Sequence, residues 1–65
     1  MSDLYIAEVM AADEIVEKLY NTKPTLNDVI YYVQTEARRL NPDDIFERMR
    51  ADVCMRIRVI EQLGL

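Results

Sequence analysis

Residues 41–64 read NPDDIFERMRADVCMRIRVIEQLG, and this stretch predicts one long helix with a start and a stop signal. Asn41 is a preferred N-cap, Pro42 suits the first helical position, and the two aspartates that follow face the positive end of the helix dipole. Gly64 suits the left-handed turn that ends a helix. We therefore expect a helix over residues 42–63.

This expected helix is long for so small a chain. About 22 residues rise ~33 Å. A compact chain of 65 residues has a radius of gyration near ~11 Å, which corresponds to a sphere ~28 Å across. The comparison favours an elongated bundle or an assembly of several chains.

The same helix carries an apolar seam whose members are spaced by three, four, four and three residues, close to a coiled-coil pattern. Ile45, Val59 and Leu63 widen one flank, so that the apolar arc spans roughly ~200°. A helix this apolar needs contacts on more than one side, from the other helices of its own chain or from a second subunit. We name as the candidate core or oligomer seam Phe46, Met49, Val53, Ile57 and Ile60.

Two further helices are expected, over residues 3–20 and 26–40. Ser2 or Asp3 can cap the first, and Pro24 prevents it from continuing. Thr25 and Asp28 resemble a capping box at the start of the second. The links are short, so consecutive helices should be neighbours. The sequence predicts a single all-α domain over residues 1–65, a three-helix bundle with a long C-terminal helix.

Composition narrows how such a small domain is stabilised. The chain has one cysteine and no histidine, which excludes an intrachain disulfide and a structural zinc site. Oligomerisation and regular helix packing are the remaining routes for a chain with a modest core. We therefore expect a homodimer or a higher homo-oligomer.

Charge and hydropathy bear on location and partners. The net charge is −4, and residues 1–22 hold five acids against Lys18, so binding to nucleic acid is disfavoured. No run approaches ~18 apolar residues, so no membrane span is expected. No signal peptide is visible and the cysteine is single, from which we expect a cytoplasmic protein.

No arrangement of residues supports catalysis. Histidine, the most common general base, is absent, and the only glycine is Gly64, so there is no glycine-rich phosphate loop. Cys54 lacks a histidine partner and is interpreted as a packed, inert thiol. Asp43 and Asp44 are interpreted as helix-start residues rather than metal ligands. We expect no enzyme activity, no cofactor and no metal.

Two groups of polar residues remain as candidates. The outer face of the helix 26–40 is either solvated or packed on another helix, or is a docking surface, since tyrosine and arginine are enriched at interaction hot spots. This candidate partner surface is Tyr31, Tyr32, Thr35, Arg38 and Arg39.

The second group consists of charges that interrupt apolar faces and must therefore be paired or hydrated. We expect Glu8 to pair with Arg50 or Arg56 of the long helix, within one chain or between chains. Asp52 and Arg56 are spaced to pair along their own helix.

These observations together favour a non-enzymatic adaptor, regulator or inhibitor that binds another protein. One alternative is a helix-turn-helix DNA-binding regulator, although Asp43 and Asp44 would then face phosphates. A second alternative is a small accessory subunit of a larger enzyme.

Overall fold

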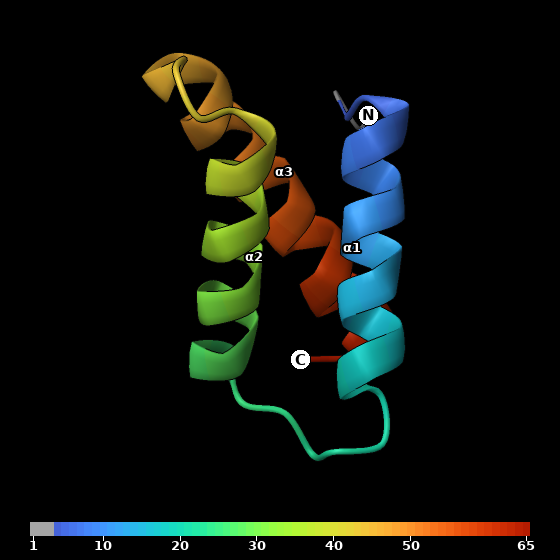
Figure 1. The fold of residues 1–65 in the computed structure, drawn as a ribbon. Coiled ribbons are helices and arrows are strands. Elements are labelled where there is room, and N and C mark those ends of the chain that lie inside the picture. The colour runs from blue at the N-terminus through green and yellow to red at the C-terminus, as the bar shows by residue number, and fades with distance from the viewer. Residues whose placement is uncertain (1–3) are drawn as a thin grey trace.

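The computed structural model describes residues 4–65, and this part of the chain folds into three helices. They are α1 (Ile6–Leu19), α2 (Leu26–Leu40) and α3 (Ile45–Leu63). In Figure 1, α1 and α2 stand side by side and α3 crosses behind them. Each helix contacts both others. The predicted all-α, three-helix fold is confirmed for the described residues.

The start of α1 depends on Glu8. Its Oε1 accepts a hydrogen bond from the backbone N–H of Tyr5 at 3.0 Å, which satisfies one of the free amides at the helix start. Tyr5 has extended backbone geometry and serves as the N-cap. The caps expected from sequence, Ser2 and Asp3, lie outside the described residues.

The predicted capping box of α2 is present. Oγ1 of Thr25 accepts from the Asp28 amide at 3.3 Å, and Oδ2 of Asp28 accepts from the Thr25 amide at 2.9 Å. In the link before it, Lys23 has a φ of 53°. Pro24 follows directly and favours non-helical geometry at Lys23, which separates α1 from α2.

α3 begins later than its sequence predicts. Asp44 is the N-cap, and its carboxylate accepts from the Glu47 amide at 3.0 Å. Asn41 instead ends α2, with its N–H bonded to the Ala37 carbonyl at 3.0 Å. Arg48 fixes the link by donating to the carbonyls of Asn41 and Pro42 at 3.2 and 2.7 Å. These bonds hold residues 41–44 outside the helix.

The C-terminus of α3 follows the prediction. Gly64 has a φ of 73°, and its N–H bonds to the Glu61 carbonyl while that of Leu65 bonds to the Ile60 carbonyl. The helix has 19 residues, or about 28 Å. The longest dimension of the molecule is 33 Å and its radius of gyration is 10.8 Å. The helix therefore fits within one compact chain, and its length alone does not require an assembly.

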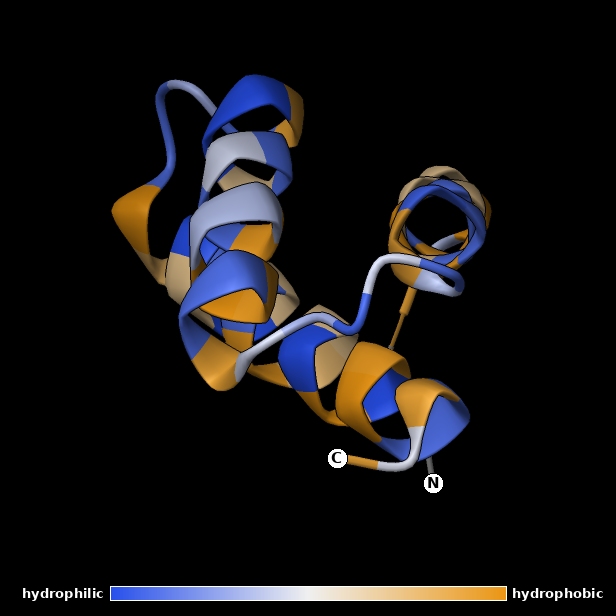
Figure 2. Ribbon diagram, turned by 90° about the horizontal axis from the view of Figure 1, so that it is seen from below, coloured by the Kyte–Doolittle hydropathy of each residue, from blue (hydrophilic) through white to orange (hydrophobic). Residues whose placement is uncertain are grey.

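The core lies where the three helices meet. α3 contributes Ala51, Met55 and Val59 to it, rather than the seam expected from sequence. Figure 2 shows hydrophobic residues recurring along α3, separated by hydrophilic ones. The rest of the buried apolar cluster comes from α1 and α2: Ala11, Ala12, Ile15, Leu19, Val29, Val33 and Ala37. Several of these side chains are small, which allows the helices to approach closely.

Substitutions at Met55 and Met10 test whether the Met55 side of α3 is the buried side. Met55 is fully buried, whereas Met10 is 59% exposed on α1. Met55→Ala should reduce the free energy of unfolding by about 2–5 kcal/mol because it opens a cavity in the core. Met10→Ala should change it by less than about 0.5 kcal/mol. Urea denaturation at one protein concentration measures both, and equal losses would contradict the packing.

Candidate protein interaction site

The predicted apolar seam lies on the outer side of α3. Met55, at the centre of the buried side, follows Val53 by two residues, so the two side chains point ~200° apart around the helix. Phe46 is 81% exposed, Met49 60%, Val53 57% and Ile57 54%. Only Ile60 is half-buried, packed against the core. The seam is thus a continuous apolar surface over nearly the whole helix.

Other residues extend this surface on both flanks. Ile45, at the first position of α3, is as exposed as Met49. On the α1 side, the exposed ring of Tyr5 lies against the Arg50 guanidinium, with 4.7 Å from Cζ to the ring centroid. This is a favourable cation–π distance. Sequence analysis did not assign Tyr5 to the site, since its partner is 45 positions away and no local spacing links them.

The two arginines near the seam are both held by carboxylates. Arg50 donates from Nη2 to Oε2 of Glu8 at 2.7 Å and from Nε to Oε2 of Glu47 at 2.8 Å. Arg56 donates from Nη2 to Oδ1 of Asp52 at 2.8 Å. Glu8 therefore faces Arg50 and not Arg56. The Nε of Arg56 is buried and has no hydrogen-bond partner within residues 4–65.

Glu8 is the buried charged residue of the described chain, at 3% exposure. Burial opposes its ionisation, but the hydrogen bonds from Arg50 and the Tyr5 amide, with the charge of Arg50, hold its pKa below the ordinary 4.5. The side-chain amide of Asn41 adds to this effect, although its buried Nδ2 completes no hydrogen bond. Glu8 is therefore ionised at neutral pH and ties the first turn of α1 to α3.

A second link between these helices joins Asp13 and Arg58, whose Oδ1 and Nε are 3.1 Å apart. Glu8 pairs with Arg50 and Asp13 with Arg58, so residue numbers increase in the same direction along both helices. α1 and α3 are therefore parallel. The Asp13 side chain is half exposed, unlike that of Glu8. Exposed pairs of this kind contribute little to stability.

Of the five candidate residues on α2, four are exposed and one, Tyr32, is half-buried. Tyr31, Thr35 and Arg38 point outward, and Thr35 donates to the Tyr31 carbonyl at 2.8 Å. Tyr32 is half-buried and turns toward α1, where Nζ of Lys18 lies 5.3 Å from its ring centroid. Arg39 is bound to Glu36 at 2.6 Å.

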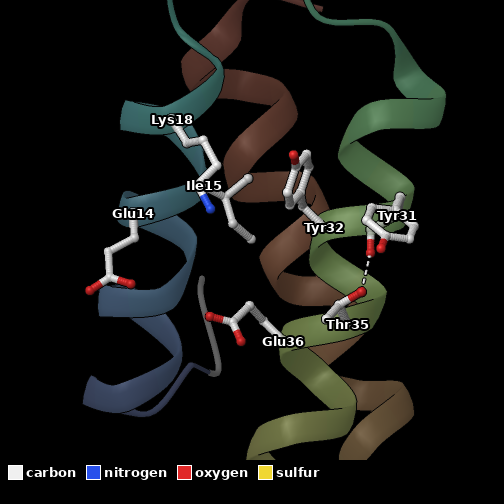
Figure 3. Close-up of a pocket in the computed structure, with 7 residues that line it drawn as sticks. All are labelled: Glu14, Ile15, Lys18, Tyr31, Tyr32, Thr35 and Glu36. Atoms are coloured by element: carbon white, nitrogen blue, oxygen red, sulfur yellow. Dashed lines mark hydrogen bonds between the residues drawn. The ribbon is translucent and has the colours of Figure 1, made fainter.

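A shallow pocket of about 260 Å³ lies between α1 and α2 beside this surface. Figure 3 shows Tyr32 at its centre, with Lys18 and Glu14 on the α1 side and Glu36 on the α2 side. The Tyr31 and Tyr32 rings meet edge to face, with centroids 5.4 Å apart. The side chains that line the pocket are thus largely in contact with one another. The pocket is a minor feature beside the α3 seam.

Within residues 4–65, no three Cys, Asp or Glu side chains are grouped as metal ligands would be. Cys54 is half-buried as a free thiol. None of the described helices combines the length and apolar character needed to cross a bilayer.

Glu8→Gln tests the buried pair, with Asp13→Asn as the matched control on the same two helices. At pH 7 the Glu8 variant should lose about 1–3 kcal/mol of unfolding free energy, because Arg50 keeps its charge without the buried carboxylate. The control should lose much less. Chemical denaturation at fixed protein concentration measures both.

The stabilisation that Glu8 provides depends on pH in a definite direction. Folding lowers the pKa of Glu8, so its stabilisation is complete above the ordinary pKa of 4.5 and is lost as the pH falls through the lowered value. The difference between the native chain and Glu8→Gln should therefore shrink in acid. A difference that stays constant with pH, or that matches Asp13→Asn, would contradict this role of Glu8.

Comparisons of the chain with protein-family models, with curated proteins and with solved structures found no significant match. The function is therefore argued from the surfaces of the chain itself.

Proposed function

We propose that this protein is a non-enzymatic protein–protein interaction module, an adaptor, regulator or inhibitor of another protein, and that it acts as a homodimer. The observation that carries the proposal is the α3 seam. Phe46, Met49, Val53 and Ile57 lie on one face of one helix, and each is more than half exposed. Isolated exposed apolar residues are common, but a continuous stripe marks an interaction site.

The size of the seam supports this interpretation. With Ile45, these side chains offer roughly 500–600 Å² of apolar surface, which is at the upper end for a monomer's largest patch. Two such surfaces pressed together bury about 1,000–1,200 Å², near the lower bound for a specific interface. The seam is therefore large enough for a helix of another protein chain.

The small core supports self-assembly. Ala11, Ala12, Ala37 and Ala51 are among the buried residues of the described chain, and alanine contributes little apolar area. Covering the α3 seam with a second subunit adds apolar burial that the single chain lacks. A short chain without disulfide or structural zinc is a natural candidate for this kind of stabilisation.

The outer face of α2 supports binding to a different protein. Tyr31 and Arg38 remain exposed there, away from the α3 seam, and both are residue types found at hot spots. DNA binding is less well supported. Asp43 and Asp44 are exposed at the start of α3, the end that would enter the major groove, and they would repel phosphates.

Met49→Glu and Met10→Glu, at two equally exposed methionines, test the self-assembly. Light scattering across a concentration series should give a dimer mass for the native chain and for Met10→Glu. Met49→Glu should give a monomer mass with unchanged helix content, because a charge in a buried interface without a partner is strongly unfavourable. A native chain that is monomeric at every concentration would contradict the homodimer.

Tyr31→Ala and Tyr20→Ala, at equally exposed tyrosines, test the partner surface. The native chain should retain a specific protein from its host, Tyr31→Ala should retain less, and Tyr20→Ala should be unaffected. The native chain should bind no duplex DNA even at low salt. Tight DNA binding that weakens steeply with added salt would instead establish the DNA-binding alternative.

A further inference from the structure

We propose that the second chain docks antiparallel on the α3 seam, related by a two-fold axis that passes beside Val53. This inference rests on the proposed homodimer and specifies its geometry. The two-fold axis runs perpendicular to α3, so that each copy presents the same surface to the other.

The spacing of the seam is the first reason. Its intervals of three, four, four and three residues read the same in both directions from Val53. Antiparallel pairing about that residue therefore places Met49 opposite Ile57 of the second copy, and Phe46 opposite Ile60. Every large apolar side chain of the seam meets another, and the two Val53 side chains meet at the axis.

Exposure along the seam distinguishes antiparallel from parallel pairing. It decreases steadily from 81% at Phe46 through Met49 and Val53 to 54% at Ile57, and Ile60 is half-buried. The seam is thus prominent at the start of α3 and recessed at its end. Antiparallel pairing brings the prominent end of one copy against the recessed end of the other. Parallel pairing would force Phe46 against Phe46 and leave a gap at the two Ile60 residues.

The charges of α3 and of the link before it are also unequal at the two ends, which favours antiparallel pairing. Residues 43–52 carry four acids and two arginines, whereas residues 54–65 carry two arginines and one acid. Antiparallel pairing sets the negative half of each copy beside the positive half of the other. It also sets the opposed helix dipoles side by side.

One flank of the seam provides a specific pair. Asp52 and Arg56 lie on the same side of α3, and the two-fold axis brings Arg56 of each copy close to Asp52 of the other. Arg56 donates to its own Asp52 from Nη2, and its side chain is 36% exposed beside the seam. The guanidinium therefore has donors left for the second carboxylate.

Single cysteines test the geometry, in a Cys54→Ser background so that each chain carries one thiol. Val53→Cys should form a covalent dimer readily under mild oxidation, because it lies at the axis. Phe46→Cys should not, since its two copies are about 21 Å apart along antiparallel helices, beyond disulfide reach. Met49→Cys and Ile57→Cys, about 12 Å from their own copies, should each fail alone but cross-link when mixed. Circular dichroism checks that each variant is folded.

Each other outcome has a distinct meaning. Cross-linking of Phe46→Cys, Met49→Cys and Ile57→Cys each with itself would establish parallel pairing and overturn the inference, leaving the homodimer intact. A dimer mass in solution without cross-linking at these positions would place the interface elsewhere and also overturn it. A monomer mass together with no cross-linking would overturn both this inference and the homodimer, leaving the seam to a different protein.

Discussion

The structure depends on one constraint: α3 is apolar on two opposite sides, and residues 4–65 cover only one of them. α1 and α2 both lie on the Met55 side, and short links join the three helices in sequence. No segment of residues 4–65 passes over the Val53 side. The single chain thus reaches a compact fold and still leaves its longest helix with an uncovered apolar face. The proposed interaction function follows from that imbalance.

The Glu8–Arg50 ion pair fixes the orientation of α3 and therefore leaves its Val53 side exposed. Glu8 caps the start of α1 through the Tyr5 amide and binds Arg50, so one carboxylate fixes a helix start and a contact between helices. The same contact draws the Arg50 guanidinium under the Tyr5 ring at the edge of the seam. A buried ion pair is a weak source of net stability, but in some proteins it specifies which surfaces meet. Here it specifies which side of α3 faces α1.

Sequence reasoning predicted the helix count, the Thr25 capping box and the Gly64 stop because each depends on local residue chemistry. It placed the start of α3 too early because Asn41 and Pro42 suit a helix start equally well in isolation. Arg48 and the Asn41–Ala37 hydrogen bond, which hold these residues in the link, appear only in the folded chain. The buried side of α3 was not predictable for a related reason. Hydrophobic periodicity identifies apolar faces of a helix. Ala51 lies in the core, but its side chain is small and contributes little to the hydrophobic pattern of the sequence.

The central claim is that the Val53 side of α3 is buried between chains in the native, unmodified protein. Isotope-filtered nuclear Overhauser spectroscopy on an equal mixture of labelled and unlabelled chains tests it directly, since only contacts between different molecules are detected. The account predicts intermolecular signals from the Val53 methyls and between Met49 and Ile57. Intermolecular signals confined to α1 or α2, or none at concentrations where a dimer should form, would contradict it.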